Sequence, residues 1–299
     1  MSSRIVITGA GGQLGSSLVA RVAGQSREVL ALTSSQWDIT DPAAAESIVR
    51  KGDVVINCAA YTNVDGAESN ESAAHAINVV GPELIARACA RAGARLIHVS
   101  TDFVFCGDHF TGEGEPRPYE PSDETEPRGV YACTKRAGEV AVLAAQPEAG
   151  VVRTAWVYTG GTGSDFVAIM RRLAAKDGPV EVVDDQVGSP TYVADLADAL
   201  LQVADDGVPG PILHAANEGT VSRFEQARAV FEECGFDPAR VLPVSSAKNP
   251  RPAPRPSYSV LSSGESAAAG MTPLRPWRPA LVAALAAAGV DRPLPPTRD

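Results

Sequence analysis

Residues 4–15 read RIVITGAGGQLG, a short β-branched run followed by glycines at positions 9, 12 and 15. The next residues, SSLVARVA, have the composition of a helix, so the stretch predicts a strand, a glycine turn and a helix in succession. Glycine is required where a chain turns sharply, where its backbone approaches a pyrophosphate and where a helix packs closely on a strand. The N–H groups and positive dipole of the helix start then bind phosphate without a lysine. Gly9, Gly12 and Gly15 therefore predict a dinucleotide site, with a simple tight turn as the alternative.

The alternation of strand and helix continues along the chain. The runs VLALT, VVINCA, RLIHVST and GVVRTAWVY are each separated by a stretch long enough for a helix. This alternation predicts an α/β protein with a Rossmann-type doubly wound parallel sheet, covered by helices on both faces.

After Val157 the pattern loosens. VEVVD and PILHAAN still have the composition of strands, but the loops DDQVGSPT and NPRPAPRPSYS are long and rich in proline and glycine. We expect residues 1–150, with part of 180–215, to form the dinucleotide-binding domain, and residues 151–299 to form mostly a smaller mixed substrate lobe interleaved with it. A last helix is expected at Ala280–Ala288, and the tail RPLPPTRD is expected to be frayed.

The composition excludes several kinds of partner. The 299 residues are 44% hydrophobic and 21% charged, which is typical of a soluble globular protein. A net charge of −10 argues against binding to nucleic acid or to an anionic membrane, because both require a basic face. The five cysteines lack C-x-x-C spacing and the four histidines lack ligand spacing, so we expect a reduced cytoplasmic protein without a catalytic metal. No apolar run is long enough for a secretion signal or a membrane span.

The stretch PRGVYACTKRAGE, residues 127–139, places Tyr131 and Lys135 four residues apart. On a helix this spacing puts both side chains on one face, where the ammonium is expected to lower the pKa of the phenol. A half-exposed tyrosine near a solvated lysine is the alternative interpretation.

Ketone reduction requires a hydride at the carbonyl carbon and a proton at its oxygen. Tyr131 is the candidate general acid, and Lys135 stabilises the phenolate and binds the ribose of the cofactor. Thr101, at the end of the fourth predicted strand, is placed to hydrogen-bond the same carbonyl oxygen. The alternative for Thr101 and Asp102 is that they are turn residues, whose side chains bond their own backbone. Asn78 either binds a backbone group or a water in the proton path, or is a buried structural amide.

The choice of cofactor depends on the end of the second strand, VLALT. Ser34 and Ser35 follow it in place of an acidic residue, so no carboxylate repels a 2′-phosphate, and NADPH is favoured with NADH possible. Asp38 and Ile39, in WDITD, fall where a loop borders the adenine. The alternative for Asp38 is a helix cap ahead of PAAAESIV.

The glycines, VSTDFVF, YACTK, AAYTNVDGAE and DQVGSPT together resemble the extended short-chain dehydrogenase/reductases, and within them the dTDP-4-dehydrorhamnose reductase family. The resemblance covers most of the chain, including the late RPSYSVL. It implies NADPH-dependent reduction of the C4 ketone of dTDP-4-dehydro-L-rhamnose to dTDP-L-rhamnose, a step in nucleotide-sugar and cell-envelope polysaccharide biosynthesis. The substrate is then a dTDP-linked 4-keto-6-deoxy sugar, and the protein a monomer or homodimer.

The resemblance also implies roles for individual residues. Cofactor contacts would come from Gly12, Gln13 and Leu14 at the pyrophosphate, Asp38 and Ile39 at the adenosine, Ala60, Tyr61 and Thr62 after the third strand, and Val99 near the nicotinamide. Substrate contacts would come from Thr101, Asp102 and Trp156 at the sugar and from Gln186 and Arg255 near the diphosphate.

Three positions depart from the pattern of the family. Phe103 replaces the usual tyrosine of STDYVF, and Cys106 and Ala132 stand where other residues are commoner. None of these changes removes a proton donor. Two other functions fit the same fold: an epimerase or dehydratase of nucleotide sugars, and a non-catalytic regulatory subunit that keeps the dinucleotide site.

Overall fold

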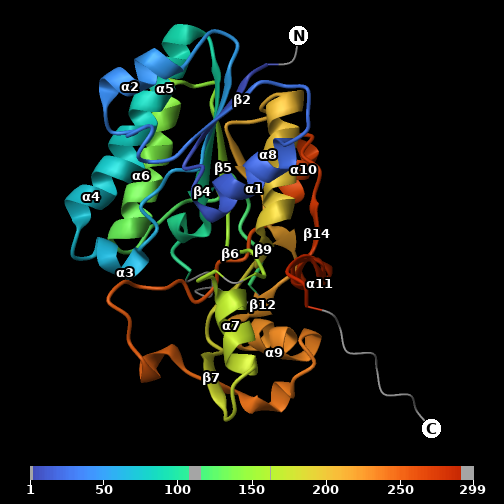
Figure 1. Cartoon of the computed structure of the whole chain (residues 1–299). Helices are drawn as coiled ribbons and strands as arrows, with labels where there is room; N and C mark the ends of the chain where they lie inside the picture. The colour runs from blue at the N-terminus through green and yellow to red at the C-terminus, as the bar shows by residue number, and fades with distance from the viewer. Residues whose placement is uncertain (1–2, 108–115, 162, 291–299) are drawn as a thin grey trace.

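A six-stranded parallel sheet forms the centre of the protein in the computed structural model, which describes residues 3–107, 116–161 and 163–290. The strands lie in the order β10-β5-β4-β3-β1-β2, and the sheet occupies the upper half of the molecule in Figure 1. Their bounds are β1 (Ile5–Thr8), β2 (Val29–Leu32), β3 (Val54–Asn57), β4 (Arg95–Thr101), β5 (Gly150–Thr154) and β10 (Ile212–His214). These strands are rich in Val, Ile and Leu, and the four inner strands are buried along nearly their whole length, as expected for a parallel sheet covered on both faces.

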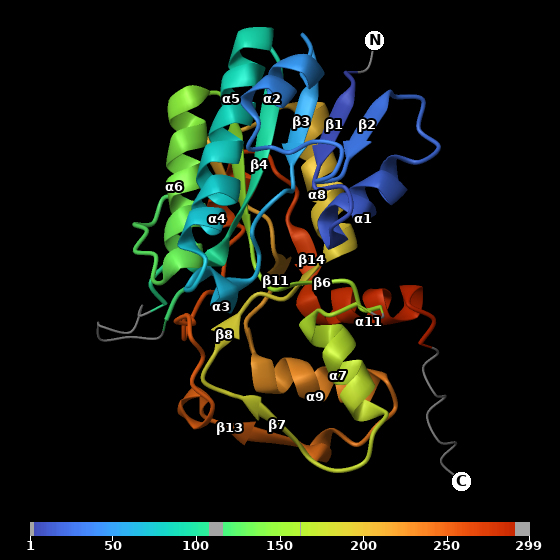
Figure 2. The same cartoon turned by 60° about the vertical axis from the view of Figure 1, so that its left-hand side comes forward.

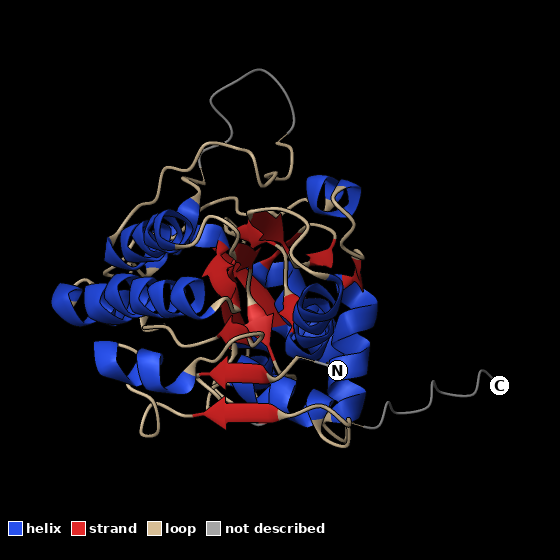
Figure 3. Cartoon of the chain, turned by 90° about the horizontal axis from the view of Figure 1, so that it is seen from above, coloured by secondary structure: helices blue, strands red, loops and turns tan. Residues whose placement is uncertain are grey.

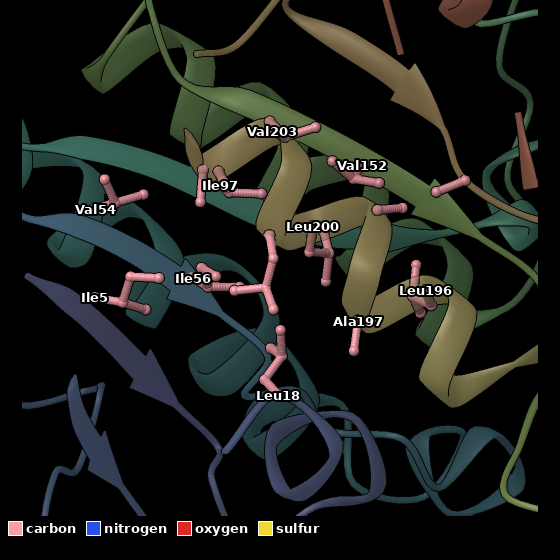
Figure 4. Close-up of a cluster of buried hydrophobic side chains, with 14 of the residues drawn as sticks. Ile5, Leu18, Val54, Ile56, Ile97, Val152, Leu196, Ala197, Leu200 and Val203 are labelled. Atoms are coloured by element: carbon pink, nitrogen blue, oxygen red, sulfur yellow. The ribbon is translucent and has the colours of Figure 1, made fainter. Parts of the chain in front are cut away.

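Helices cover both faces of this sheet, as Figures 2 and 3 show. One face carries α1 (Gln13–Val22) and α8 (Val193–Asp206), and the other carries α2 (Pro42–Ile48), α5 (Gly81–Ala92) and α6 (Val130–Ala145). The main core lies between the sheet and the first pair of helices, where Ile56 and Ile97 pack against Leu18 and Leu200 (Figure 4). The predicted doubly wound α/β fold is confirmed.

The strand order reverses between β1 and β3, because the chain adds β2 on one side of β1 and β3 with its successors on the other. At such a reversal the loops leaving the two strands separate and form a crevice at their carboxyl ends, where open α/β sheets bind ligands. The glycine turn follows the carboxyl end of β1, at this point of the sheet.

A smaller lobe lies beyond the carboxyl ends of the strands, in the lower half of Figure 1. It contains α7 (Phe166–Ala174), α9 (Arg223–Glu233) and α11 (Trp277–Ala287), with β7 (Val180–Val183) parallel to β13 (Val241–Val244). Short strand pairs join the lobe to the sheet: β6 (Val157–Tyr158) with β9 (Thr191–Tyr192), β8 (Val187–Gly188) with β12 (Val221–Ser222), and β11 (Asn217–Glu218) with β14 (Leu274–Pro276). The lobe has its own core, which includes Val167, Met170, Val230, Phe231 and Leu281.

The remaining regular elements are single turns. They are α3 (Val64–Ala67), α4 (Glu71–His75), a π-helical turn (Ala76–Val80), α10 (Gly264–Ala268), and 3-10 turns at Asp102–Val104, Pro238–Arg240 and Ser246–Lys248. No helix in the described part of the chain is long and apolar enough to cross a membrane.

The structure modifies two of the predicted segments. GVVRTAWVY is not one strand, because β5 ends at Thr154 and the chain turns at Trp156 before β6. The predicted last helix begins three residues earlier than expected, at Trp277. The tail RPLPPTRD lies outside the described residues.

Candidate active site

Tyr131 lies in the first turn of α6, beside the residue that ends β4. The helix begins after Gly129, whose φ of +81° is a left-handed conformation suited to glycine. A Cβ at this position would lie 2.8 Å from Glu68 Oε1, which accepts a 2.8 Å hydrogen bond from the Val130 N–H. Glu68, the last residue of AAYTNVDGAE, therefore caps the helix and fixes the point at which Tyr131 leaves it.

The phenol of Tyr131 is partly buried between aromatic and hydroxyl groups. Its ring meets Phe103 edge to face, with centroids 5.7 Å apart, and its hydroxyl lies beside the Thr101 side chain, which favours the ionised phenol. Burial raises the pKa of Tyr131 to about 12; Thr101 opposes this shift and the charge of Asp102 adds to it. The expectation that Lys135 lowers this pKa is wrong, since the pKa is raised and Lys135 is not among the groups that shift it. The phenol is therefore protonated at neutral pH and can serve as an acid.

Lys135 lies one turn further along α6 and is almost fully buried. Its Nζ donates a 2.8 Å hydrogen bond to the carbonyl oxygen of Val99 in β4. Burial lowers the pKa of the ammonium to about 8, against the opposing effects of Glu139 and Cys58. The ammonium is thus still charged at pH 7, and it is fixed to β4 two residues before Thr101.

Asp102 accepts two hydroxyl hydrogen bonds. Thr101 Oγ1 donates to Asp102 Oδ1 over 3.0 Å, and Ser259 Oγ donates to Asp102 Oδ2 over 2.6 Å. Burial raises the pKa of Asp102 to about 6, although both hydroxyls and Arg223 favour its charged form. Thr101 also accepts from the Phe103 N–H at 3.2 Å, so its alternative role as a turn residue is present alongside its contact with Tyr131.

Trp156 is held in a strained conformation at the start of the smaller lobe. Its φ of +46° makes it the single non-glycine residue with a positive φ in the described part of the chain. The guanidinium of Arg223 lies 3.5 Å from the centroid of its ring, and a Cβ on Gly188 would lie 2.5 Å from its Cε2. The indole is therefore enclosed between Arg223 and the glycine of DQVGSPT, and it also packs against a hydrophobic cluster that includes Tyr258.

The glycine turn has the close packing that a dinucleotide site requires. Gly9 has a φ of +63°, and a Cβ there would lie 2.8 Å from the Ala59 nitrogen in the loop after β3. A Cβ on Gly15 would overlap the Gly9 carbonyl oxygen. Gly12 and Gln13 are exposed at the start of α1, and no side chain caps this helix. Its first N–H groups are consequently available to a pyrophosphate, and the turn fits the predicted dinucleotide.

Leu14, the next residue of α1, is partly buried and packs against both the central core and the core of the smaller lobe. Gln13 Nε2 also reaches the smaller lobe, 3.5 Å from Asp165 Oδ2. The predicted pyrophosphate segment therefore lies at the junction between the sheet and the lobe.

The two residues predicted at the adenosine differ in their exposure. Asp38 is exposed, and its Oδ1 accepts from the Thr40 N–H at 2.9 Å and from the Thr40 hydroxyl at 2.7 Å. Asp41, not Asp38, caps α2, through a 2.9 Å bond from the Ala43 N–H, so the alternative interpretation of Asp38 as the helix cap is wrong. Ile39 is almost fully buried, and its Cδ1 lies against Gly81 of α5.

The loop after β3, predicted to line the cofactor, is fixed by Asn78. Its Oδ1 accepts from the Tyr61 N–H at 2.8 Å, and its Nδ2 donates to the Tyr61 carbonyl at 3.3 Å and to Thr134 Oγ1 at 3.1 Å. Asn78 is therefore a backbone clamp that ties the loop to α6. Ala60 beside it is partly buried, and Thr62 is exposed.

Gln186 and Arg255, predicted near the diphosphate, contact different residues of the site. Arg255 Nη2 donates to Asp65 Oδ1 at 3.0 Å, and its guanidinium lies 5.9 Å from the centroid of the Phe103 ring. The carbonyl of Gln186 accepts from the Arg223 N–H at 3.0 Å. Both segments thus border the site that contains Tyr131.

Comparison with known proteins assigns this geometry to a family. The sequence model of the family described as RmlD substrate binding domain matches residues 3–290. The chain belongs to the RmlD substrate binding domain family.

Relatives in this family carry informative names. A protein from Mycobacterium tuberculosis named dTDP-4-dehydrorhamnose reductase is 73% identical over 302 residues, which cover 100% of this chain and 99% of that protein. A crystal structure of a dTDP-4-dehydrorhamnose reductase from Clostridium acetobutylicum has a TM-score of 0.88 and 36% identity, covering 96% of this chain and 99% of the other. A reductase structure from Bacillus anthracis, in complex with NADP, has a TM-score of 0.87 and 34% identity, covering 94% and 98%. The resemblance inferred from the sequence motifs is confirmed.

The sequence motifs of the RmlD substrate binding domain family did not reveal three residues that the structure brings to the site. They are Glu68, which caps α6, Ser259, which bonds Asp102, and Arg223, which stacks on Trp156. Glu68 lies inside the motif AAYTNVDGAE, and Ser259 lies inside RPSYSVL. Their place in these motifs could have indicated that both residues belong to the site. Arg223 had no such signal, because it follows an ordinary helix cap at Ser222.

Proposed function

We propose that the protein reduces the C4 ketone of dTDP-4-dehydro-L-rhamnose to dTDP-L-rhamnose with NADPH. The observation that carries the proposal is the placement of Tyr131 beside Thr101, two residues from the Val99 carbonyl that accepts a hydrogen bond from Lys135. A proton donor, a neighbouring hydroxyl and a cation thus meet at the carboxyl end of β4, where open α/β sheets bind their ligands. The relatives named above, at up to 73% identity over the full chain, support the same substrate and reaction.

We propose that NADPH binds across the crevice between β1 and β3. Gly9, Gly12, Gln13, Leu14 and Gly15 would hold its pyrophosphate at the uncapped start of α1. Asp38 and Ile39 would border its adenosine, and Ala60, Tyr61, Thr62 and Val99 would line it towards the nicotinamide. The bound cofactor supplies the hydride for the ketone carbon. The NADP complex of the Bacillus anthracis relative supports this choice of cofactor.

Tyr131 donates the proton to the ketone oxygen in this proposal. Its raised pKa of about 12 keeps the phenol protonated until negative charge develops on that oxygen. Before the transfer, the Thr101 proton is donated to Asp102, and Thr101 lies beside the phenol, whose own proton is directed at the ketone oxygen. After the transfer, the phenolate is a far stronger base than a carboxylate with a pKa of about 6, so it attracts the Thr101 proton and is stabilised.

Lys135 contributes charge and position. Its ammonium is held by the Val99 carbonyl, and it retains donors for the ribose hydroxyls of the cofactor. A charged ammonium in this buried position also favours the negative charge that develops on the ketone oxygen.

The sugar nucleotide would lie between the sheet and the smaller lobe. Trp156 and Asp102 would contact the sugar, and the cations of Arg223 and Arg255 would attract the diphosphate. Gln186 would contribute a further polar group beside Arg223. These local cations are needed because the net charge of the chain, −10, repels anions.

The test is turnover of a defined substrate. Purified protein is supplied with dTDP-4-dehydro-L-rhamnose and NADPH or NADH, and cofactor absorbance and the stereochemistry of the product at C4 are followed. We expect stoichiometric oxidation of NADPH and formation of dTDP-L-rhamnose. Tyr131→Phe should lose at least about 100-fold in turnover and still bind NADPH. Product formation without net oxidation of the cofactor, or full activity in the Tyr131→Phe variant, would contradict the proposal.

We also propose the cytoplasm as the site of action and a monomer or homodimer as the assembly. The net charge and the absence of cysteine pair motifs support a soluble protein in a reducing compartment. Light scattering of the purified chain, with and without NADPH, measures the assembly directly.

A further inference from the structure

Two hydrogen bonds connect a serine far away in the sequence to the threonine beside Tyr131. Ser259 Oγ donates to Asp102 Oδ2 at 2.6 Å, Thr101 Oγ1 donates to Asp102 Oδ1 at 3.0 Å, and Thr101 lies beside the Tyr131 phenol. Ser259 is 1% exposed and Asp102 2% exposed, so water does not compete for either group. Because Asp102 accepts from both hydroxyls, the position of Ser259 sets the orientation of the carboxylate that binds Thr101.

Ser259 is held firmly by its own backbone. Its N–H donates to the Val187 carbonyl at 2.8 Å, and the Val187 N–H donates to the Ser257 carbonyl at 2.9 Å. On its other side, the Val260 carbonyl accepts from the Tyr119 N–H at 2.8 Å. A hydroxyl attached to a backbone that is bonded on both sides offers Asp102 a donor at a fixed point.

We propose that Ser259 is a positioning residue for the reduction, which keeps Asp102 as a carboxylate oriented to fix Thr101 against Tyr131. The proposal rests on the reductase function proposed above. Ser259 touches neither the phenol nor the hydroxyl of Thr101 directly, and acts through Asp102.

The charge state of Asp102 decides whether this arrangement holds. A carboxylate accepts both hydroxyl protons at once, whereas a neutral carboxyl carries a proton on one oxygen, and one of the two hydroxyls must then turn away. If the Thr101 hydroxyl turns, the arrangement beside the phenol is lost. Turnover is therefore expected to fall as Asp102 becomes protonated.

The hydrogen bond from Ser259 favours the carboxylate, against the burial that raises the pKa of Asp102 to about 6. Two other charged or titratable side chains act with Asp102: Arg223 of α9, whose charge favours the carboxylate, and Tyr131 of α6, which is neutral in this pH range. Neither is altered when Ser259 is replaced, so a change in the titration of Asp102 reports on Ser259.

The experiment compares Ser259→Ala with the wild-type protein between pH 5 and 8. Loss of the hydrogen bond should raise the pKa of Asp102 by about one unit. The acidic inflection of kcat should move upward by the same amount, which lowers kcat about threefold at a pH half a unit above the wild-type inflection. Asp102→Asn should lack the inflection, and Ser259→Thr, which keeps the hydroxyl, should restore it to the wild-type position.

Ser262→Ala is the matched control. Ser262 lies three residues later in the same segment and also donates a 2.6 Å hydrogen bond to a carboxylate, Glu120. Its loss should leave the inflection unchanged, because Glu120 is not bonded to Thr101.

A second readout does not depend on turnover. Titration of the Asp102 carboxyl by carbon-13 NMR, with the resonance assigned by its absence in Asp102→Asn, measures the pKa in the protein without substrate. Equal pKa values in the wild type and Ser259→Ala overturn the proposal whatever the kinetics. A shifted pKa with coincident kcat profiles overturns the positioning role. If the wild-type protein fails to reduce the ketone, the proposed function fails, while the NMR titration still decides whether Ser259 controls the charge of Asp102.

Discussion

Replacement of Gly188 by alanine tests whether the Trp156 indole is held where the structure places it. A Cβ at this position would lie 2.5 Å from Trp156 Cε2, 2.6 Å from Cζ2 and 2.9 Å from Nε1. Gly188 does not have a positive φ, so the backbone itself accepts alanine and the cost is steric. The indole cannot move away freely, because the guanidinium of Arg223 stacks on its ring, 3.5 Å from the ring centroid. We expect a destabilisation of about 1–3 kcal/mol, the usual cost of overpacking.

The free energy of unfolding in urea is measured for Gly188→Ala in the wild-type protein and in a Trp156→Ala background, which lacks the indole. In a Trp156→Ala background, Gly188→Ala should cost less than about 0.5 kcal/mol, because the clashing atoms are absent. Gly210→Ala is the control: the nearest atom to its added Cβ is 4.0 Å away, so the change should stay within about 0.5 kcal/mol. In the active protein, Gly188→Ala should raise KM for the sugar nucleotide and leave the dissociation constant of NADPH unchanged.

An equal penalty for Gly188→Ala in both backgrounds would refute this reasoning, since the cost would then arise from the backbone and not from the indole. If Gly188→Ala destabilises the protein as expected but leaves KM unchanged, Trp156 is packed as described and does not contact the sugar.

Three further changes test other parts of the site. Lys135→Met should raise the dissociation constant of NADPH at least about tenfold by fluorescence titration, because a charged donor to the cofactor is lost; unchanged affinity contradicts its ribose contact. Glu68→Gln weakens the cap at the Val130 N–H and should lower the free energy of unfolding by about 0.5–1 kcal/mol, whereas Glu148→Gln, at an exposed position, should have no effect. The pKa of Asp102 in the folded protein, about 6, lies above its ordinary value of 3.8. The contribution of Asp102 to the free energy of unfolding is therefore fully present below pH 3.8 and is lost as the pH rises to about 6. Relative to Asp102→Asn, the wild type should therefore lose up to about 3 kcal/mol over that range, and parallel pH curves of unfolding would exclude this.

The sheet was predictable because its strands are short runs rich in Val, Ile and Leu, and the four inner strands are almost fully buried. β1, β2, β3 and β4 lie within the predicted segments RIVITG, VLALT, VVINCA and RLIHVST. The break inside GVVRTAWVY was not predictable, because Trp156 adopts a positive φ that its residue type disfavours. Such strain persists only where the surroundings enforce it, here through Arg223 and Gly188, which are distant in the sequence.

The site was predictable where its geometry is local. The glycine turn and the spacing of Tyr131 and Lys135 lie within single elements, and the structure places them as those elements dictate. The direction of the pKa shift of Tyr131 was predicted wrongly, because it depends on burial that no spacing reveals and that outweighs the effect of Thr101. Ser259 was missed for a related reason: its bond to Asp102 spans 157 residues.

The motifs AAYTNVDGAE and DQVGSPT have a shared physical purpose that explains why they are informative together. Asp65, from the first, accepts from Arg251, Arg255 and the Ala253 N–H. The second holds the other end of the same segment, through Val187 at Ser259 and through the hydroxyl of Ser189 at the Leu261 N–H. Residues 251–261 are thus fixed at both ends as they pass the site. Because a hydroxyl must lie within about 3 Å of a carboxylate to bond it, this double attachment is what sets Ser259 against Asp102. Each motif therefore helps to position Ser259, which lies in a segment that neither of them contains.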